Sequence, residues 1–267
     1  MRQVIPVWVI NLKKRPDRLK KIGKRLSQLG IEWENIEAID GQSCKENVLD
    51  ISLKFGEIGF LSDNTRACSA SHYKVWELLI SRKVHYGIIL EDDVELSDDF
   101  KDLLYDDSWI PKGSNLIKLE KFAPNKVSTI LIGSVLSQAL GNSRHVHEMY
   151  SRHTGAAAYL LSRKGAEKLV KCNSQFTVPI DHLLFNETVS KVCTALKPMI
   201  LIPPIAWQTV EAGQGSNIVG SYKINQLSKL KKIKRSLKRS YYETRLWPYQ
   251  LWILLRGKAK LKNIFPK

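Results

Sequence analysis

The sequence predicts an α/β fold with a mostly parallel sheet over residues 1–220, followed by a basic helical tail over residues 221–267. Short β-branched apolar runs alternate with segments of helical period, which is the pattern of strands joined by crossover helices. The 267 residues are 43% hydrophobic and 25% charged, which excludes a disordered or fibrous chain. No apolar run approaches the roughly 18 residues that a membrane span needs.

The chain opens with a strand, a helix and a second strand. Residues 4–12 are apolar and β-branched, and we interpret them as a buried strand rather than a signal peptide, because no extended apolar region or small-residue cleavage site is present. Pro16 opens a helix whose apolar residues recur every three or four positions, and Gly30 ends it. Residues 31–39 predict the second strand.

The remaining elements follow from the same two periods. A helix is predicted over residues 65–82 and another over 163–172, with Ser162 as its N-cap. A short apolar strand at residues 87–90 stops at three acids. Further strands are expected at residues 116–119, 130–132, 156–161, 192–196 and 200–202.

The positive charge is concentrated at the C-terminal end. Residues 220–267 hold 14 Lys or Arg and one acid, whereas the preceding 219 residues carry a net charge of only +3. Apolar residues of this segment recur at helical spacing among lysines, and aromatic residues follow them: Ile224, Leu227, Leu230, Ile233 and Leu237, then Tyr241, Tyr242, Trp247, Tyr249 and Trp252. This pattern predicts a helix that lies on an anionic membrane surface; the alternative is a helix packed on the body with a solvated lysine face.

The four cysteines form no CxxC pair. A zinc site or a disulfide framework is therefore not expected, and the cysteines are interpreted as buried thiols of a reducing compartment.

Glu91-Asp92-Asp93 directly follow the strand at residues 87–90. Ligands of open α/β sheets bind beyond the carboxyl ends of the strands, and hard oxygen ligands suit Mg²⁺ or Mn²⁺. Such an ion could neutralise a leaving diphosphate. The alternative is a solvated acidic turn that caps the following helix.

Several motifs, in this order, resemble glycosyltransferase family 25, which contains bacterial lipooligosaccharide galactosyltransferases. They are residues 9–12 (Val-Ile-Asn-Leu) with Arg15-Pro16-Asp17-Arg18, residues 36–41 (Ile-Glu-Ala-Ile-Asp-Gly), residues 56–59 (Gly-Glu-Ile-Gly) with 67–72 (Ala-Cys-Ser-Ala-Ser-His), and residues 90–94 (Leu-Glu-Asp-Asp-Val). Weaker matches lie at residues 153–156, at 179–181 and from Gln208 to Ser216. Residues 60–66 form an insertion relative to the family pattern.

The resemblance implies a GT-A-like fold and an inverting transfer of a hexose, commonly galactose, from a UDP-sugar. It implies a divalent ion, Mn²⁺ or Mg²⁺, held by Glu91 and Asp93. Gln208, after Pro203-Pro204, is the candidate third ligand of this ion or, alternatively, a phosphate-binding residue. The resemblance also implies that the donor sugar nucleotide contacts a set of residues from several elements: Asn11, Arg15, Arg18, Asp40, Ser71, His72, Asp92 and Gly155.

Asp181 is the favoured general base, because a carboxylate at the start of the short helix near residues 182–186 is well placed to accept a proton. It is equally an ordinary N-cap, and His153 and His182 are rivals. The implied acceptor is a lipid-linked lipooligosaccharide or lipopolysaccharide core glycan, modified on the inner face of a bacterial cytoplasmic membrane.

Two other functional classes are compatible with these residues. A metal-dependent phosphodiesterase or nuclease could use the same acids, with the tail on nucleic acid, although no known DNA-binding motif is present. A non-catalytic membrane-bound carbohydrate-binding protein could retain the fold. No nucleic-acid partner is expected for the transferase.

Overall fold

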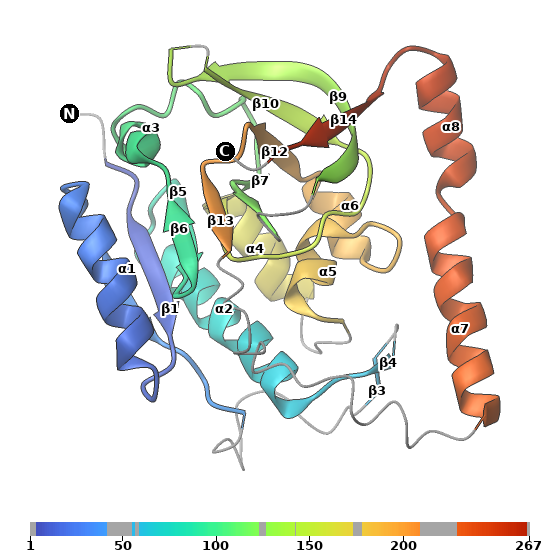
Figure 1. Ribbon diagram of the computed structural model, residues 1–267, viewed down its shortest axis with the longest axis horizontal. Coiled ribbons are helices and arrows are strands. Elements are labelled where there is room, and N and C mark those ends of the chain that lie inside the picture. Colours follow the sequence, from blue (N-terminus) through green and yellow to red (C-terminus); the bar gives the residue numbers. More distant parts are fainter. Residues whose placement is uncertain are drawn as a thin grey trace.

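The computed structural model describes residues 4–41, 55–56, 59–122, 127–141, 143–172, 178–208 and 229–265. A nine-stranded sheet forms the centre, in the order β14-β9-β10-β12-β7-β11-β5-β1-β2 (Figure 1). Its strands along the chain are β1 (Val7–Asn11), β2 (Glu34–Glu37), β5 (Tyr86–Glu91), β7 (Leu116–Lys118), β9 (Ser128–Ala139), β10 (Arg144–Met149), β11 (Ala158–Ser162), β12 (Met199–Ile202) and β14 (Lys260–Ile264).

The expectation of a mostly parallel sheet is wrong: the sheet is mixed. Three of its strand pairs are parallel, β1 with β2, β1 with β5, and β7 with β12. The other five pairs are antiparallel. The antiparallel pairing of β9 with β10 has a simple cause, since a short connection between consecutive strands can only reverse the chain.

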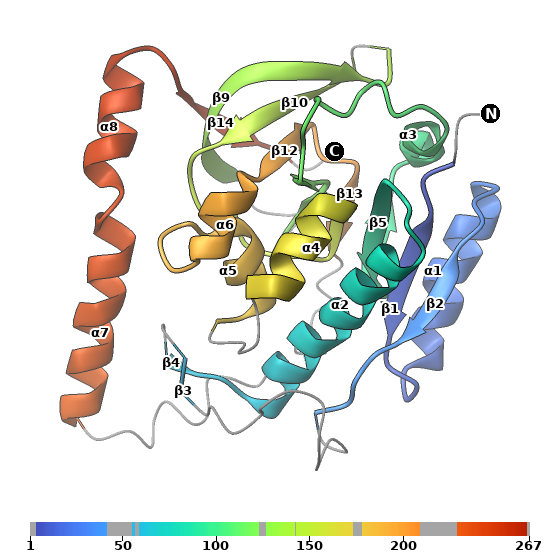
Figure 2. The same ribbon diagram turned by 180° about the vertical axis from the view of Figure 1, so that it is seen from behind.

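Helices cover both faces of the sheet, as the two opposite views show (Figures 1 and 2). On one face lie α1 (Pro16–Gln28), the 3-10 turn Asp98–Lys101 and α3 (Asp102–Tyr105). On the other lie α2 (Asp63–Ser81), α4 (Arg163–Cys172), α5 (Ile180–Phe185) and α6 (Lys191–Leu196). Two hydrophobic clusters follow from the alternation of β1: Trp8 and Ile10 pack toward α2, and Val7 and Val9 toward α1.

Several predicted elements are confirmed, and one is wrong. The helices at α1, α2 and α4 are found, and Ser162 Oγ accepts the Gly165 N–H as an N-cap does. Residues 192–196, expected to be a strand, lie in α6. Ser190 caps this helix by accepting the Cys193 N–H, and Lys197 ends it in the left-handed conformation, with φ 51°. A short apolar run has no period long enough to distinguish the two structures.

The other strands of the described residues form two small sheets. One contains β6 (Val94–Leu96), β8 (Glu120–Lys121) and β13 (Ala206–Gln208), and the other contains β3 (Phe55–Gly56) and β4 (Gly59–Phe60).

The C-terminal segment contains α7 (Lys229–Thr244) and α8 (Trp247–Leu255), which stand beside the body at one end of the molecule (Figure 1). The predicted helix is found, although its first apolar residues, Ile224 and Leu227, lie outside the described residues. The strand β14 that follows was not predicted, and it pairs with the edge strand β9 of the main sheet. Within the described ranges, no helix combines the length and apolarity that a bilayer span requires.

Candidate active site

The acidic triplet lies where the parallel strands end, as predicted. Asn11 is the last residue of β1 and Glu91 the last of the neighbouring β5, where Ile10 is the register partner of Glu91. Neighbouring parallel strands present their carboxyl ends at one edge of the sheet. Asn11 Nδ2 therefore reaches Asp92 Oδ2, at 2.6 Å.

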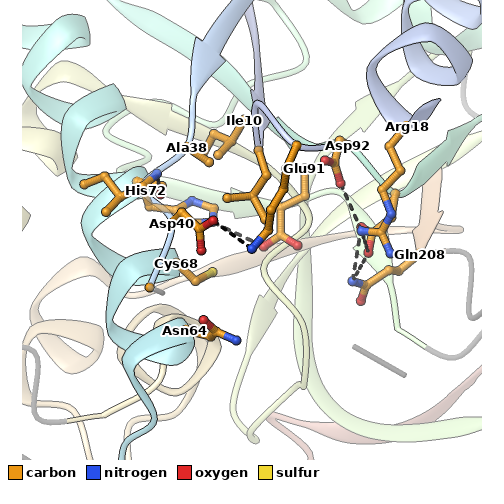
Figure 3. Close-up of a pocket in the computed structure, with 16 residues that line it drawn as sticks. Ile10, Arg18, Ala38, Asp40, Asn64, Cys68, His72, Glu91, Asp92 and Gln208 are labelled. Atoms are coloured by element: carbon orange, nitrogen blue, oxygen red, sulfur yellow. Dashed lines mark hydrogen bonds and ion pairs between the residues drawn. The ribbon is translucent and has the colours of Figure 1, made fainter. Parts of the chain in front are cut away.

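Arg18 reaches the same acids from the first helix. Since α1 begins directly after β1, with Pro16 in its first turn, Arg18 lies above the strand ends. Its guanidinium donates to Asp92 Oδ1 at 3.1 Å and to Asp93 Oδ2 at 3.3 Å. Asp92 is thus fixed by the Asn11 amide and the Arg18 guanidinium together; Figure 3 shows Arg18 beside Asp92.

Gln208 comes from a distant part of the chain. Strand β13 pairs antiparallel with β6, and Gln208 is the register partner of Val94, next to the triplet. Gln208 Nε2 consequently donates to both oxygens of Asp93, at 3.2 and 3.0 Å. Gln208, a candidate metal ligand in the sequence, thus lies beside Asp93 across 115 positions of sequence.

Helix α2 presents Cys68, Ser71 and His72 to the same pocket, because residues three and four apart share a helix face. His72 Nε2 lies 3.2 Å from Glu91 Oε1, and its Nδ1 lies 2.8 Å from the Tyr159 hydroxyl. Trp76 Nε1 donates to that hydroxyl, at 3.0 Å. The Tyr159 hydrogen is then available for His72 Nδ1, which places the imidazole hydrogen on Nε2, facing Glu91.

Ser71 and Asp40 shape the rim of the pocket. Ser71 Oγ accepts the Ile39 N–H at 2.8 Å and donates to the Ala67 carbonyl at 2.7 Å, so it ties the loop after β2 to α2. Asp40 forms an ion pair with Lys14, at 2.7 Å. No sequence motif singled out Lys14, although its position three residues after Asn11, beyond the end of β1, was a usable signal.

Crowded carboxylates dominate the electrostatics of the pocket. Burial, followed by the charges of Glu120, Asp92 and Asp181, raises the pKa of Glu91 to about 8. Burial and the charge of Glu91 likewise raise the pKa of Asp93 to about 7. Arg18 and Gln208 oppose the shift at Asp93 without cancelling it. The pocket therefore favours an additional positive charge.

Asp181 and Gly155 lie beside the pocket rather than in its lining. Asp181 is in the first turn of α5 and accepts the Gly155 N–H, at 3.4 Å. Its charge contributes to the raised pKa of Glu91, so the two carboxylates are neighbours. The Nδ1 atom of the rival His182 lies 2.7 Å from Asn186 Nδ2. The other rival, His153, is buried, and burial lowers its pKa to about 3.

Arg15 is directed elsewhere. Its guanidinium binds the exposed carboxylate of Asp17, at 2.8 Å, and Arg15 is not among the residues that line the pocket.

A buried charge pair that no sequence motif indicated supports the Gly155 turn. Lys118 and Glu120 are both fully buried, and Lys118 Nζ donates to Glu120 Oε1 at 2.8 Å and to the Gly155 carbonyl. The Ala157 N–H donates to the same Glu120 oxygen, at 3.1 Å. The available signal was two charged residues two positions apart in an otherwise apolar stretch, at the end of β7 and the start of β8, because burying a charge is costly unless it is paired.

Comparison with known proteins identifies the family. The model of glycosyltransferase family 25, described as an LPS biosynthesis protein family, matches residues 4–184. The chain belongs to glycosyltransferase family 25. The resemblance found in the sequence is thereby confirmed.

Curated relatives match most of the chain at low identity. A Drosophila melanogaster glycosyltransferase 25 family member is 26% identical over 82% of this chain and 38% of its own length. The lipooligosaccharide biosynthesis protein lic2B of Haemophilus influenzae is 25% identical over 67% of this chain and 69% of its own. Human procollagen galactosyltransferase 2 is 29% identical over 67% of this chain and 29% of its own length. The chain thus spans from about a third to two thirds of these relatives.

Among solved structures, a glycosyltransferase involved in glycosylation of the major capsid of PBCV-1 matches with a TM-score of 0.41 and 10% identity, over 90% of this chain and 99% of that one.

Proposed function

We propose that this family 25 chain is an inverting glycosyltransferase that moves a hexose, galactose, from a UDP-sugar to a lipooligosaccharide or lipopolysaccharide core glycan. The observation that carries the proposal is the convergence of Arg18, Glu91, Asp93 and Gln208 on one pocket at the carboxyl edge of β1 and β5. Asn11 supports this pocket through its hydrogen bond to Asp92. Names of two relatives, a lipooligosaccharide biosynthesis protein and a procollagen galactosyltransferase, support the acceptor and the sugar.

The donor site would hold the nucleotide between the ends of β1 and β2 and the α2 face. Asn11 and Arg18 keep Asp92 in a fixed position, and Lys14 with Asp40 borders the pocket near the loop after β2. Lys14 and Arg18 supply the positive charge that a nucleotide diphosphate requires.

A divalent ion would fit the acidic side of this pocket. Glu91, Asp93 and Gln208 would hold it, and its charge would offset the burial and the mutual repulsion that raise the pKa of both carboxyl groups. Such an ion, when bound, stabilises negative charge on a departing diphosphate.

Asp181 is the proposed base. In the transfer, the acceptor hydroxyl oxygen forms a bond to the anomeric carbon, the bond from that carbon to the UDP oxygen breaks, and the hydroxyl proton passes to the Asp181 carboxylate. The Gly155 N–H orients this carboxylate from the side. Attack opposite to the leaving group accounts for inversion.

A panel of UDP-sugars tests the reaction class. With Mn²⁺ and a core-glycan acceptor, we expect UDP release to be fastest from UDP-galactose. A preference for another UDP-sugar would refute galactose as the transferred sugar but not the glycosyltransferase reaction. Cleavage of nucleic acid would indicate a phosphodiesterase, and glycan binding without UDP release would indicate a non-catalytic protein.

We also propose that residues 221–267 hold the enzyme on the anionic inner face of a bacterial cytoplasmic membrane, where lipid-linked acceptors are assembled. Three apolar side chains of α7 are 79%, 57% and 66% exposed: Leu230, Ile233 and Leu237. In the sequence they alternate with lysines and arginines, and each such charge near an anionic surface adds about 1 kcal/mol. Trp247 and Leu255 of α8 are exposed as well.

Substitution tests this contact better than truncation, because deleting the segment would also remove β14 from the sheet. We expect the triple change of Leu230, Ile233 and Leu237 to Ser to reduce binding to phosphatidylglycerol-containing vesicles. Sugar transfer to a soluble acceptor, measured as release of UDP, should be unchanged. Tyr105→Ser, at an exposed apolar residue of α3, is the matched control. Undiminished vesicle binding of the triple variant would refute the contact.

A further inference from the structure

The thiol of Cys68 faces two other metal-ligating groups in the pocket. One atom each of Cys68, His72 and Glu91 lies within 4.8 Å of the other two. We propose that these three residues form a binding site for a thiophilic divalent ion of the zinc class. The inference concerns ion binding and does not depend on sugar transfer.

The backbone holds the three groups in place. Cys68 and His72 are four residues apart on α2 and therefore share one face of a rigid helix, while Glu91 ends the buried strand β5. In a tetrahedral zinc site with bonds of about 2.0–2.3 Å, ligand atoms lie about 3.3–3.8 Å apart. Side-chain rotations that move the ligand atoms by about 1 Å would bring the three atoms from within 4.8 Å of one another to these distances.

A second observation is the fixed orientation of His72. Its Nδ1 contacts the Tyr159 hydroxyl, which in turn accepts from Trp76, and all three side chains are buried. Metal-bound histidines are commonly oriented in this way, by a hydrogen bond at the other ring nitrogen. When Nε2 binds the ion, the ring hydrogen resides on Nδ1, facing Tyr159.

Thiolate, imidazole and carboxylate are the ligand types of zinc, whereas Mg²⁺ and Mn²⁺ prefer oxygen. Ion binding releases the thiol proton of Cys68 to solvent, and the positive charge offsets the surrounding carboxylates. Of the acidic triplet, Glu91 alone contacts His72; Asp92 and Asp93 are bound by Arg18. Because Glu91 would serve both sets, zinc and an oxygen-bound ion would exclude one another.

Cobalt absorption tests the site, since a cobalt–thiolate bond gives a near-ultraviolet charge-transfer band. With the chelator-treated full chain and Co²⁺, we expect this band, its loss on adding Zn²⁺, and its absence in Cys68→Ser. Cys193→Ser, at a buried thiol of α6, should retain it. Tyr159→Phe should weaken Co²⁺ binding by about tenfold, as the loss of an orienting partner does.

Absence of Co²⁺ binding, binding without a thiolate band, or a band that persists in Cys68→Ser would each overturn the proposal. If circular dichroism shows that Cys68→Ser does not fold, alkylation of the wild-type chain followed by mass spectrometry replaces it. We then expect Zn²⁺ to slow labelling of Cys68 at least tenfold and to leave Cys193 unchanged. Equal labelling of Cys68 with and without Zn²⁺ would overturn the site.

Discussion

Gly155→Ala tests the turn that connects the buried charge pair to the proposed base. Gly155 has φ +89°, and a Cβ atom built there would lie 2.4 Å from Glu120 Oε1. Glu120 is fully buried and is bound through that oxygen by Lys118 and by the Ala157 N–H, so it has little freedom to move.

Two costs add to give the expected effect. A non-glycine residue in a left-handed conformation costs about 1–2 kcal/mol. Displacing the Glu120 carboxylate from its buried partners costs about 1–3 kcal/mol more. We therefore expect Gly155→Ala to lower the free energy of unfolding by about 2–5 kcal/mol.

Gly113→Ala is the matched control. Gly113 has φ +82°, and a Cβ there would meet no atom within 4 Å. Urea unfolding, followed by both fluorescence and circular dichroism, should show a loss of only about 1–2 kcal/mol for this variant. Equal destabilisation of the two variants would refute the contact with Glu120 as the source of the additional cost.

Three further predictions concern the same region. Lys118→Met leaves Glu120 buried without its charge partner and should cost about 3–5 kcal/mol in urea unfolding; the double variant with Glu120→Gln should recover most of that loss. Burial lowers the pKa of His153 from 6.5 to about 3. Between these pH values, His153 is therefore protonated only in the unfolded chain. Below pH 6.5 the free energy of unfolding therefore falls by about 1.4 kcal/mol per pH unit. His153→Gln should remove this part of the pH dependence of unfolding, and an unchanged pH dependence would contradict the prediction. Asp181→Asn should lower kcat for sugar transfer about 10²–10⁴-fold with little change in KM for the donor, and unaltered kcat would exclude Asp181 as base.

Local patterns predicted much of the fold because they depend on neighbouring residues. The helix after Pro16 and the strand before Glu91 follow from apolar period and from capping residues. Strand direction and sheet order were not predictable in this way, since pairing joins residues far apart in sequence. Strand β14 illustrates this: four of its five residues are exposed, so it lacks the apolar alternation that marks a strand.

The candidate site divides along the same line. Asn11, Arg18 and the acidic triplet lie at strand and helix ends that the sequence indicated, and the structure brings them together. Lys118 and Glu120 were missed, because charged residues in a strand usually face solvent and only tertiary packing buries them. Ser71 has an anchoring contact with the Ile39 N–H that no periodicity could disclose.

Isothermal titration calorimetry of UDP, in the presence of Mn²⁺, tests most directly whether this pocket is the nucleotide site. We expect saturable binding to the wild-type chain and at least tenfold weaker binding to Asp93→Asn. Arg82→Ala, which removes an exposed ion pair with Glu34, should bind UDP as the wild type does. Equal affinity of Asp93→Asn and the wild type, or no binding to either, would contradict the placement of the nucleotide beside Asp93.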